Sequence, residues 1–369
     1  MSENVLPKKV FDYVFELPTY TGLDYAGQAD FFENEYAKVV GHGGCSAAIK
    51  TVNGETITAR NLDFYISNKP AFVVRTEVPG AYKTVGTAYV PWFGPTNEET
   101  LAEGVAEKYA KLYPFCCSDI LNEKGLYIEL NMRTEEFHDG VPRYRDAGLN
   151  PGGERVSAIA FVRYVAERCA TIDDVLEMLK EIDYYSLSAA GTEWGFCYAI
   201  ADATGNYGIL EIAGDKVYFN QYQPVQTNMY LAPELAANQL YKSGLGRYNT
   251  LMANIHKVKS EQDMQKLIDL VQFSTQYTDP ENCAFDVRHE YYDAAAGIDY
   301  AMLMDPANQE KLQEAIDKYV AWWHSLSRQE KQDDGTIWET SISTCTNVTK
   351  RTMHVRFFED EERSLVLTF

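Results

Sequence analysis

The Asn53-Gly54 pair is the strongest folding signal in this chain, because it lies between two strand-like segments. Asn-Gly is typical of a two-residue type I′ turn, in which both residues take a positive φ angle. The segment Ser46 to Val52 precedes the pair and Glu55 to Ala59 follows it, and both segments read as strands. The sequence therefore predicts a tight antiparallel hairpin in which Val52 faces Glu55.

The side chains of Cys45, Arg60 and Asp63 lie at the open end of this hairpin. A glycine-rich stretch comes directly before Cys45. In the predicted register Cys45 lies opposite Leu62, Arg60 shares the face of Cys45, and Asp63 lies on the other face. A cysteine nucleophile needs a positive neighbour and a positioned base. We therefore expect a catalytic group here, in which Asp63 reaches the backbone nitrogen of Cys45 more easily than its sulfur.

Composition limits the partners of the chain. Its 369 residues are 46% hydrophobic and 24% charged, enough to bury a large core. A formal net charge of −21 argues against nucleic acid or an anionic membrane as a partner, because both bind clustered Lys and Arg. The sequence contains no run of about 20 apolar residues, so no membrane span is predicted.

The seven cysteines leave at least one unpaired, and none stands in the CxxC spacing of a zinc or redox site. We therefore predict no cofactor and no metal, and a reducing compartment. Asp12 and Glu16 interrupt the N-terminal apolar residues before a signal-peptide core of roughly 7 to 15 residues can form. These features favour a cytoplasmic location.

The chain divides into a lead, residues 1–44, and a single domain, residues 45–369. Strands at both ends of the domain with helices between them predict an α+β fold, with sheets packed face to face and covered by helices. Thr171 and Ser260 stand where helix N-caps are expected. Further strands are predicted over 71–77, 82–90, 117–131, 194–202, 207–213, 216–219, 336–348 and 353–358, and helices over 28–40, 156–169, 172–182, 261–273 and 305–328.

Five separate motifs follow one another along the sequence. They are Cys45-Ser46, Ala59-Arg60-Asn61-Leu62-Asp63, Asn122-Glu123-Lys124-Gly125-Leu126 with the strand end Leu130-Asn131, Thr227-Asn228, and Arg247-Tyr248. In order and chemistry they resemble the choloylglycine hydrolase and penicillin V acylase family of N-terminal-nucleophile hydrolases, the linear amide C–N hydrolases. The resemblance covers roughly residues 45 to 250 and is weaker in the terminal strands.

This resemblance implies a four-layer αββα sandwich and a specific mechanism. Family members expose the cysteine as the N-terminal residue, so removal of residues 1–44 is implied. The freed α-amino group, with a reference pKa of about 7.7 to 8.0, then serves as the base for its own thiol. Asp63 would hold that amino group and Arg60 would favour the thiolate.

The resemblance also assigns the remaining site residues. Asn131 and Asn228 would donate to the oxyanion, and Arg247 would complete the polar surround of Cys45. Attack on a linear N-acyl amide would give a thioester, which water hydrolyses. Each residue also has an ordinary structural explanation: a buried cysteine, an Arg60–Asp63 ion pair, and asparagines at turns or strand ends.

Three departures from the family leave the substrate open. Only 18 residues separate Asn228 from Arg247, where bile salt hydrolases carry a longer excursion that assembles their tetramer, so homo-oligomer formation stays open here. A helical insertion over about 285–335 has no counterpart in the smaller members. The lead is longer than the initiator methionine that many cytoplasmic members remove, and whether its removal is autocatalytic also stays open.

Within this class the candidates are conjugated bile salts, penicillin V, N-acyl amino acids and fatty-acid amides. An acyltransferase that uses the same thioester is a close alternative, and a non-catalytic, zymogen-like binding protein of the same fold is a more distant one. A papain-like peptidase is disfavoured, because none of the six histidines sits in a recognisable partner motif.

Overall fold

The computed structural model of the chain describes residues 6–22, 44–65, 67–89, 94–102, 104–105, 111–134, 148–185, 187–189, 192–213, 215–236, 244–272 and 338–369. The predicted helices over 28–40 and 305–328, and the insertion over about 285–335, lie outside these residues.

Within the described residues the strands form two large sheets and one small parallel pair, β9 (Arg155–Ser157) with β10 (Asp183–Tyr185). The larger sheet runs β1-β2-β5-β6-β7-β8-β12-β13-β14, with β11 on the side of β12. Its strands are β1 (Lys8–Phe11), β2 (Val14–Glu16), β5 (Ala71–Thr76), β6 (Thr84–Ala88), β7 (Cys117–Asn122), β8 (Leu126–Thr134), β11 (Leu187–Ala189), β12 (Thr192–Asp202), β13 (Tyr207–Ala213) and β14 (Lys216–Gln221).

The second sheet, of six strands, runs β15-β3-β4-β16-β17-β18. Its strands are β15 (Val225–Gln226), β3 (Gly44–Val52), β4 (Glu55–Tyr65), β16 (Trp338–Asn347), β17 (Thr352–Phe357) and β18 (Asp360–Leu367). The predicted hairpin is confirmed as β3 and β4, with Val52 opposite Glu55 and positive φ angles at Asn53 and Gly54. The sheet therefore joins the hairpin to strands from the other end of the chain.

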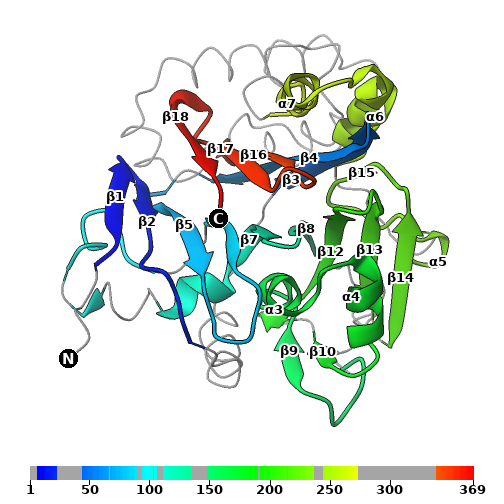
Figure 1. The fold of residues 1–369 in the computed structure, drawn as a ribbon, viewed down its shortest axis with the longest axis horizontal. Helices are drawn as coiled ribbons and strands as arrows, with labels where there is room; N and C mark the ends of the chain where they lie inside the picture. Colours follow the sequence, from blue (N-terminus) through cyan, green and yellow to red (C-terminus); the bar gives the residue numbers. More distant parts are fainter. Residues whose placement is uncertain are drawn as a thin grey trace, which may run out of the picture.

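The α-helices of the described residues are α3 (Phe161–Arg168), α4 (Ile172–Met178), α5 (Pro233–Ala236), α6 (Leu245–Asn254) and α7 (Glu261–Asp269), with the short 3₁₀ turns η2 (Tyr113–Phe115) and η3 (Ile255–Lys257). Helices α3, α4, α6 and α7 lie on the outer faces of the sheets (Figure 1). Helices α3 and α4 contact the larger sheet, whereas α6 and α7 contact the six-stranded sheet. The two sheets contact each other through β3 and β4 against β8 and β12.

This arrangement is a four-layer αββα sandwich, which confirms the expected fold. Three clusters of buried apolar side chains in the described residues separate the four layers. Strand alternation explains the division: Ile49 of β3 belongs to the cluster between the sheets, whereas Ala48 belongs to the cluster under α7. Full burial of one Val, Leu or Ile side chain contributes about 1.5–3 kcal/mol, so these clusters dominate the stability of the fold.

Most of the predicted elements are confirmed, and Thr171 and Ser260 are the N-caps of α4 and α7. The helix predicted over 156–169 starts only at Phe161, because residues 155–157 pair with β10 instead. The sequence analysis missed α6 and the C-terminal strand β18. The predicted meander is confirmed as the antiparallel order β12-β13-β14.

The lead contributes two strands that the sequence analysis did not predict. Strand β2 pairs in parallel with β5, and β1 pairs with β2 at the edge of the larger sheet. Val14 and Phe15 are fully buried, in the cluster between the sheets and in the cluster under α3 respectively. Further along, the guanidinium of Arg163 lies 4.3 Å from the ring centre of Tyr20. Residues 6–22 are therefore packed as part of the sandwich.

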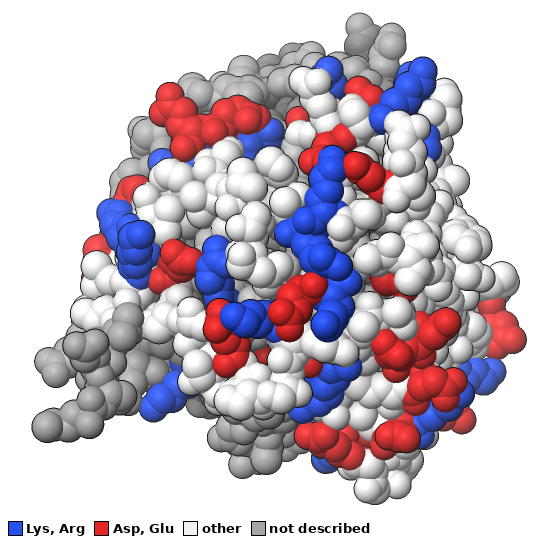
Figure 2. Space-filling model, in the orientation of Figure 1, with Lys and Arg blue, Asp and Glu red and all other residues white. Residues whose placement is uncertain are grey.

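On the face seen in Figure 2, Lys and Arg side chains lie beside Asp and Glu side chains rather than in one wholly basic patch. None of the described helices is long and apolar enough to cross a membrane.

Candidate active site

The hairpin places Cys45 inside the sandwich, at the start of a strand flanked on both sides. Cys45 lies opposite Leu62, and Gly44 lies opposite Asp63, as the turn register predicted. The neighbouring strand β15 pairs with β3 at Ala47 and Ala48. The Cys45 side chain is fully buried in the cluster between the two sheets.

Two side chains from distant segments hold the backbone of Cys45. Its N–H donates to Oδ1 of Asn228 at 2.8 Å, and its carbonyl oxygen accepts from Nη1 of Arg247 at 2.5 Å. Arg247 also donates through Nη2 to the same Oδ1 at 2.9 Å and through Nη1 to Oγ of Ser46 at 3.0 Å. Asn228 and Arg247 therefore act as one clamp on Cys45, binding the peptide unit before it and the peptide unit after it.

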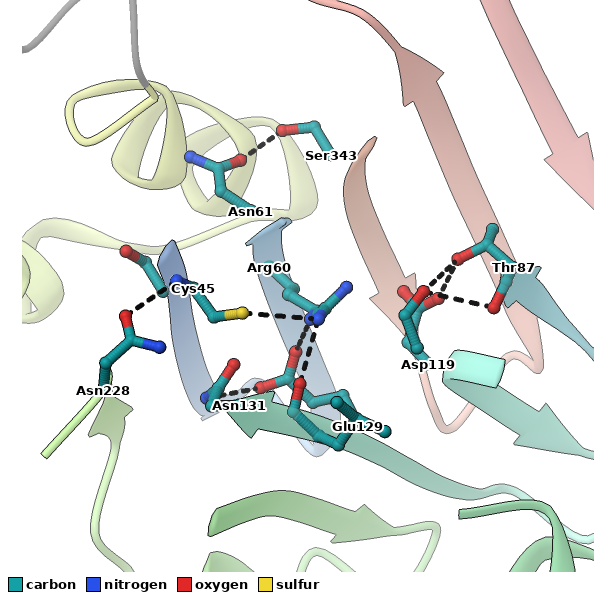
Figure 3. A network of polar contacts seen from close by, with 12 residues as sticks. Cys45, Arg60, Asn61, Thr87, Asp119, Glu129, Asn131, Asn228 and Ser343 are labelled. Carbon is teal, nitrogen blue, oxygen red and sulfur yellow. Dashed lines mark hydrogen bonds and ion pairs between the residues drawn. The ribbon is translucent and has the colours of Figure 1, made fainter. Parts of the chain in front are cut away.

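The sulfur of Cys45 faces a different set of groups, all between the sheets (Figure 3). Nη2 of Arg60 lies 3.7 Å from Sγ of Cys45 and donates to the carbonyl of Leu130 at 2.9 Å. Nε of Arg60 lies 2.5 Å from Oε2 of Glu129, and Nδ2 of Asn131 donates to Oε1 of Glu129 at 3.1 Å. The thiol therefore has a cation beside it, as the hairpin register predicted.

Asp63 lies on the opposite face of β4, toward the helices, as strand alternation predicted. Its Oδ1 accepts from Oγ1 of Thr340 at 2.6 Å, and its Oδ2 lies 3.8 Å from Nη1 of Arg247. Burial raises the pKa of Asp63 to about 7, against the opposing effects of Arg247 and Thr340. In the intact chain the acceptor at the nitrogen of Cys45 is Asn228, and Asp63 meets this cluster through Arg247.

The surroundings of Cys45 act on the pKa of its thiol in opposite directions. Burial raises its pKa above the ordinary value, and the nearby charges of Glu129 and Asp63 raise it further, although Arg60 lowers it. A protonated thiol is a weak nucleophile and needs a base within reach.

The structure brings together all six side chains that the sequence analysis named. Cys45, Arg60 and Asp63 lie on the hairpin, Asn131 lies in β8, and Asn228 follows β15. The sixth, Arg247, lies in α6 and is buried.

Glu129 is a site residue that the sequence analysis missed. It contacts both Arg60 and Asn131 and is completely buried. Its position two residues before Asn131 puts both side chains on one face of β8. An acidic residue on the same strand face as Asn131 was the signal that could have found it.

The segment that carries Asn228 is anchored on both sides. The amide of Gln226 donates to the carbonyls of Thr227 and Met229, both at 2.8 Å. The two carboxylate oxygens of Glu211 accept from the backbone N–H groups of Leu231 and Ala232, both at 2.7 Å. These contacts fix the backbone around Asn228 without any regular secondary structure.

The described residues contain no group of three or more His, Cys, Asp or Glu side chains arranged to hold a metal ion. No disulfide joins any two of the six described cysteines.

Comparisons with known proteins give one family match and several matches to solved structures at low sequence identity. Residues 147–284 match the model of the family described as acyl-coenzyme A:6-aminopenicillanic acid acyl-transferase. This range contains Asn228 and Arg247, whereas Cys45, Arg60 and Asn131 precede it. No curated protein matches the chain.

Among solved structures, a mutant of conjugated bile acid hydrolase from Clostridium perfringens is 13% identical, with a TM-score of 0.41, over 88% of this chain and 92% of that one. Penicillin V acylase from Agrobacterium tumefaciens is 15% identical, with a TM-score of 0.40, over 85% of this chain and 83% of that one. The chain has the αββα fold, and the acyl-transferase family model matches the part of it that carries Asn228 and Arg247.

Proposed function

We propose that this chain is an amidase that cleaves a linear N-acyl amide through Cys45, after the bond between Gly44 and Cys45 is cut. The observation that carries the proposal is the clamp on the backbone of Cys45. Asn228 and Arg247 bind the nitrogen and the carbonyl oxygen of this one residue, from positions far away in the sequence. These two contacts satisfy the buried backbone groups of Cys45, and they also place an amide and a guanidinium at the nitrogen that cleavage would free.

Cleavage before Cys45 changes the chemistry of this position. The amide nitrogen, which now donates to Asn228, becomes an α-amino group with a reference pKa of about 7.7 to 8.0. This amine then takes the proton of the Cys45 thiol, while Arg60 stabilises the thiolate. Asp63 would hold the charged amine from the other face of the hairpin, next to its strand partner Gly44.

The reaction then proceeds in two balanced steps. The thiolate of Cys45 attacks the amide carbonyl, the C–N bond breaks, and the amine product leaves with a proton from the α-ammonium group. Water, deprotonated by the α-amine, attacks the thioester and releases the carboxylic acid.

The side-chain amides of Asn131 and Asn228 each have two N–H donors. Asn131 uses one to bind Glu129, and Asn228 uses one to bind the carbonyl of Met132. The second N–H of each amide would bind the oxyanion.

A mass measurement tests the proposal directly. We expect intact mass of the active protein to show a chain that begins at Cys45, and incubation with a panel of N-acyl amides to add the mass of an acyl group to that chain. Full hydrolytic activity from a chain that still begins at Met1 would refute the mechanism. Hydrolysis that is indistinguishable between the wild type and Cys45→Ser, whether present or absent, would refute the catalytic role of Cys45, and its absence from both would favour the non-catalytic alternative.

A second candidate is an acyltransferase, because the matched family model is described as an acyl-transferase. The same thioester of Cys45 would then pass its acyl group to an amine instead of water. Supplying a small amine acceptor during turnover separates the two functions. An N-acyl product formed in preference to the free acid would favour transfer.

A further inference from the structure

Glu129 lies fully buried inside the larger sheet, where burial raises the pKa of its carboxyl group to about 8 although Arg60 lowers it. Its strand β8 is paired on both sides at this position, with Asp119 of β7 and with Ala199 of β12. Its side chain is inaccessible to solvent. A carboxylate in such a place is costly unless it is paired and hydrogen-bonded, so its partners define its role.

The partners of Glu129 are two residues of the candidate site. Oε2 lies 2.5 Å from Nε of Arg60, and Oε1 accepts from Nδ2 of Asn131 at 3.1 Å. A guanidinium is planar, so contacts at Nε and at Nη2 together fix its plane. The Nη2 contact is the hydrogen bond to the carbonyl of Leu130, and the same nitrogen lies 3.7 Å from Sγ of Cys45.

We propose that Glu129 is a positioning residue, whose carboxylate holds the guanidinium of Arg60 against the sulfur of Cys45 and the amide of Asn131 beside it. The inference rests on the proposed role of Cys45 as the nucleophile. Without this carboxylate, the long Arg60 side chain would be free to turn toward other acceptors between the sheets, such as the carboxylate of Asp119.

Glu129 could affect the thiol of Cys45 in two ways, through its own negative charge or through the position of Arg60, and the two ways shift the pKa of the thiol in opposite directions. Arg60 from β4 favours the thiolate, whereas Glu129 from β8 and Asp63 from β4 disfavour it. Arg247 from α6 binds the carbonyl of Cys45 on the other face of the hairpin. If Glu129 contributed only charge, its removal would lower the pKa of the thiol. If it holds Arg60 in place, its removal raises that pKa.

The experiment compares the alkylation of Cys45 by iodoacetamide at one fixed pH in the wild type, Glu129→Gln and Arg60→Met. Mass analysis of the peptide that contains Cys45 gives each rate. Loss of a neighbouring opposite charge shifts a pKa by about 1–3 units, so we expect Arg60→Met to react about 10- to 1000-fold more slowly. We expect Glu129→Gln to lower the alkylation rate of Cys45 as well. An unchanged or faster rate in folded Glu129→Gln overturns the proposal.

A second variant keeps the test decisive where Glu129→Gln does not fold. Glu129→Asp retains the carboxyl group but shortens the side chain by one methylene group, which moves the carboxyl group away from Arg60. It therefore tests the position of the carboxyl group without removing its charge. We expect slower alkylation here too, and a wild-type rate overturns the proposal.

Glu167→Gln is the matched control, because Glu167 is an equally buried partner of an arginine, Arg163, in helix α3. It should lower thermal stability without changing the alkylation rate of Cys45. A rate change in this control as large as that in the Glu129 variants would assign the effect to general loosening and overturn the proposal.

The thiolate can also be followed without any reagent or turnover. Its ultraviolet absorbance is measured as the difference between each protein and its Cys45→Ser counterpart, at the same fixed pH. A lower thiolate fraction in both Glu129 variants supports the positioning role even in a chain that is never cleaved and shows no amidase activity. Failure of the proposed function is thereby separated from failure of this inference.

Discussion

Oδ1 of Asn228 accepts the backbone hydrogen of Cys45 at 2.8 Å, although 183 positions separate the two residues in the chain. The same oxygen accepts from Arg247. One amide oxygen therefore joins the hairpin, the segment after β15 and helix α6.

Replacing Asn228 with alanine should impair both processing and turnover. The variant leaves the N–H of Cys45 and Nη2 of Arg247 without their buried acceptor, at about 1–3 kcal/mol for each group. Loss of an oxyanion donor lowers kcat by about 10²- to 10³-fold. Intact mass gives the cleaved fraction and steady-state hydrolysis gives kcat. Asn254→Ala, at the end of α6, is the control and should behave like the wild type; a wild-type kcat for Asn228→Ala would contradict its role.

Glu211 should affect catalysis through the backbone it holds. Its two oxygens accept from the N–H groups of Leu231 and Ala232, and a glutamine can accept through only one. We expect Glu211→Gln to lower kcat several-fold, with KM nearly unchanged, because Asn228 loses its fixed position. Steady-state kinetics with any turned-over N-acyl amide measure the effect. Glu234→Gln, an exposed carboxylate on α5, serves as the control. A change confined to KM would point instead to substrate contact.

The lead should remain bound after the chain is cut. Residues 14–16 pair along β5, and the side chains of Val14 and Phe15 are buried in two different layers. We expect native mass spectrometry to show both fragments together, and denaturing conditions to separate them. A chain expressed from Cys45 onward should aggregate, because it exposes the surfaces that these residues cover. Phe15→Ala should weaken retention, since truncation of a buried Phe costs about 3–5 kcal/mol. Dissociation of the lead at native pH would contradict this prediction.

Stability should depend on pH through Asp63. Its pKa is raised from about 3.9 in the unfolded chain to about 7 in the folded protein, so the folded state binds the extra proton between these values. The contribution of Asp63 to stability is therefore complete below about pH 4 and is lost as the pH rises to about 7.

The test compares the free energy of unfolding across this range for Cys45→Ser and for Cys45→Ser combined with Asp63→Asn, so that neither chain is cleaved. Relative to the double variant, the single variant should be more stable at about pH 4 than at about pH 7, because only the single variant retains the titrating carboxyl. A difference between the two proteins that stays constant with pH would contradict the prediction.

Much of the candidate site could be predicted because Cys45, Arg60 and Asp63 lie on one hairpin, close together in the sequence. The Asn53-Gly54 turn fixes the register of β3 and β4, and that register alone put Arg60 on the face of Cys45 and Asp63 on the other. The N-caps Thr171 and Ser260 were equally local, since a cap depends on hydrogen bonds within one turn. The remaining site residues, such as Asn131, came from the resemblance in the order of the motifs.

Other features had no local signal. Helix α6 begins after a glycine with a positive φ angle and has no side-chain cap, so nothing in its sequence marked its start. Strand β2 is three residues long and exists because β5 pairs with it. A short strand is marginal by itself, and its partner is chosen by the packing of the whole sheet.

The sequence by itself determined the hairpin, the alternation of its faces and therefore the charged neighbours on each side of Cys45, because turn and strand geometry act over a few residues. Only the tertiary structure decided that Asn228 and Arg247 meet at the backbone of Cys45, that Glu129 links Arg60 to Asn131, and that the lead is part of the larger sheet. These contacts join segments far apart in the chain, and they form because burying the apolar faces of two sheets and their helices brings those segments together.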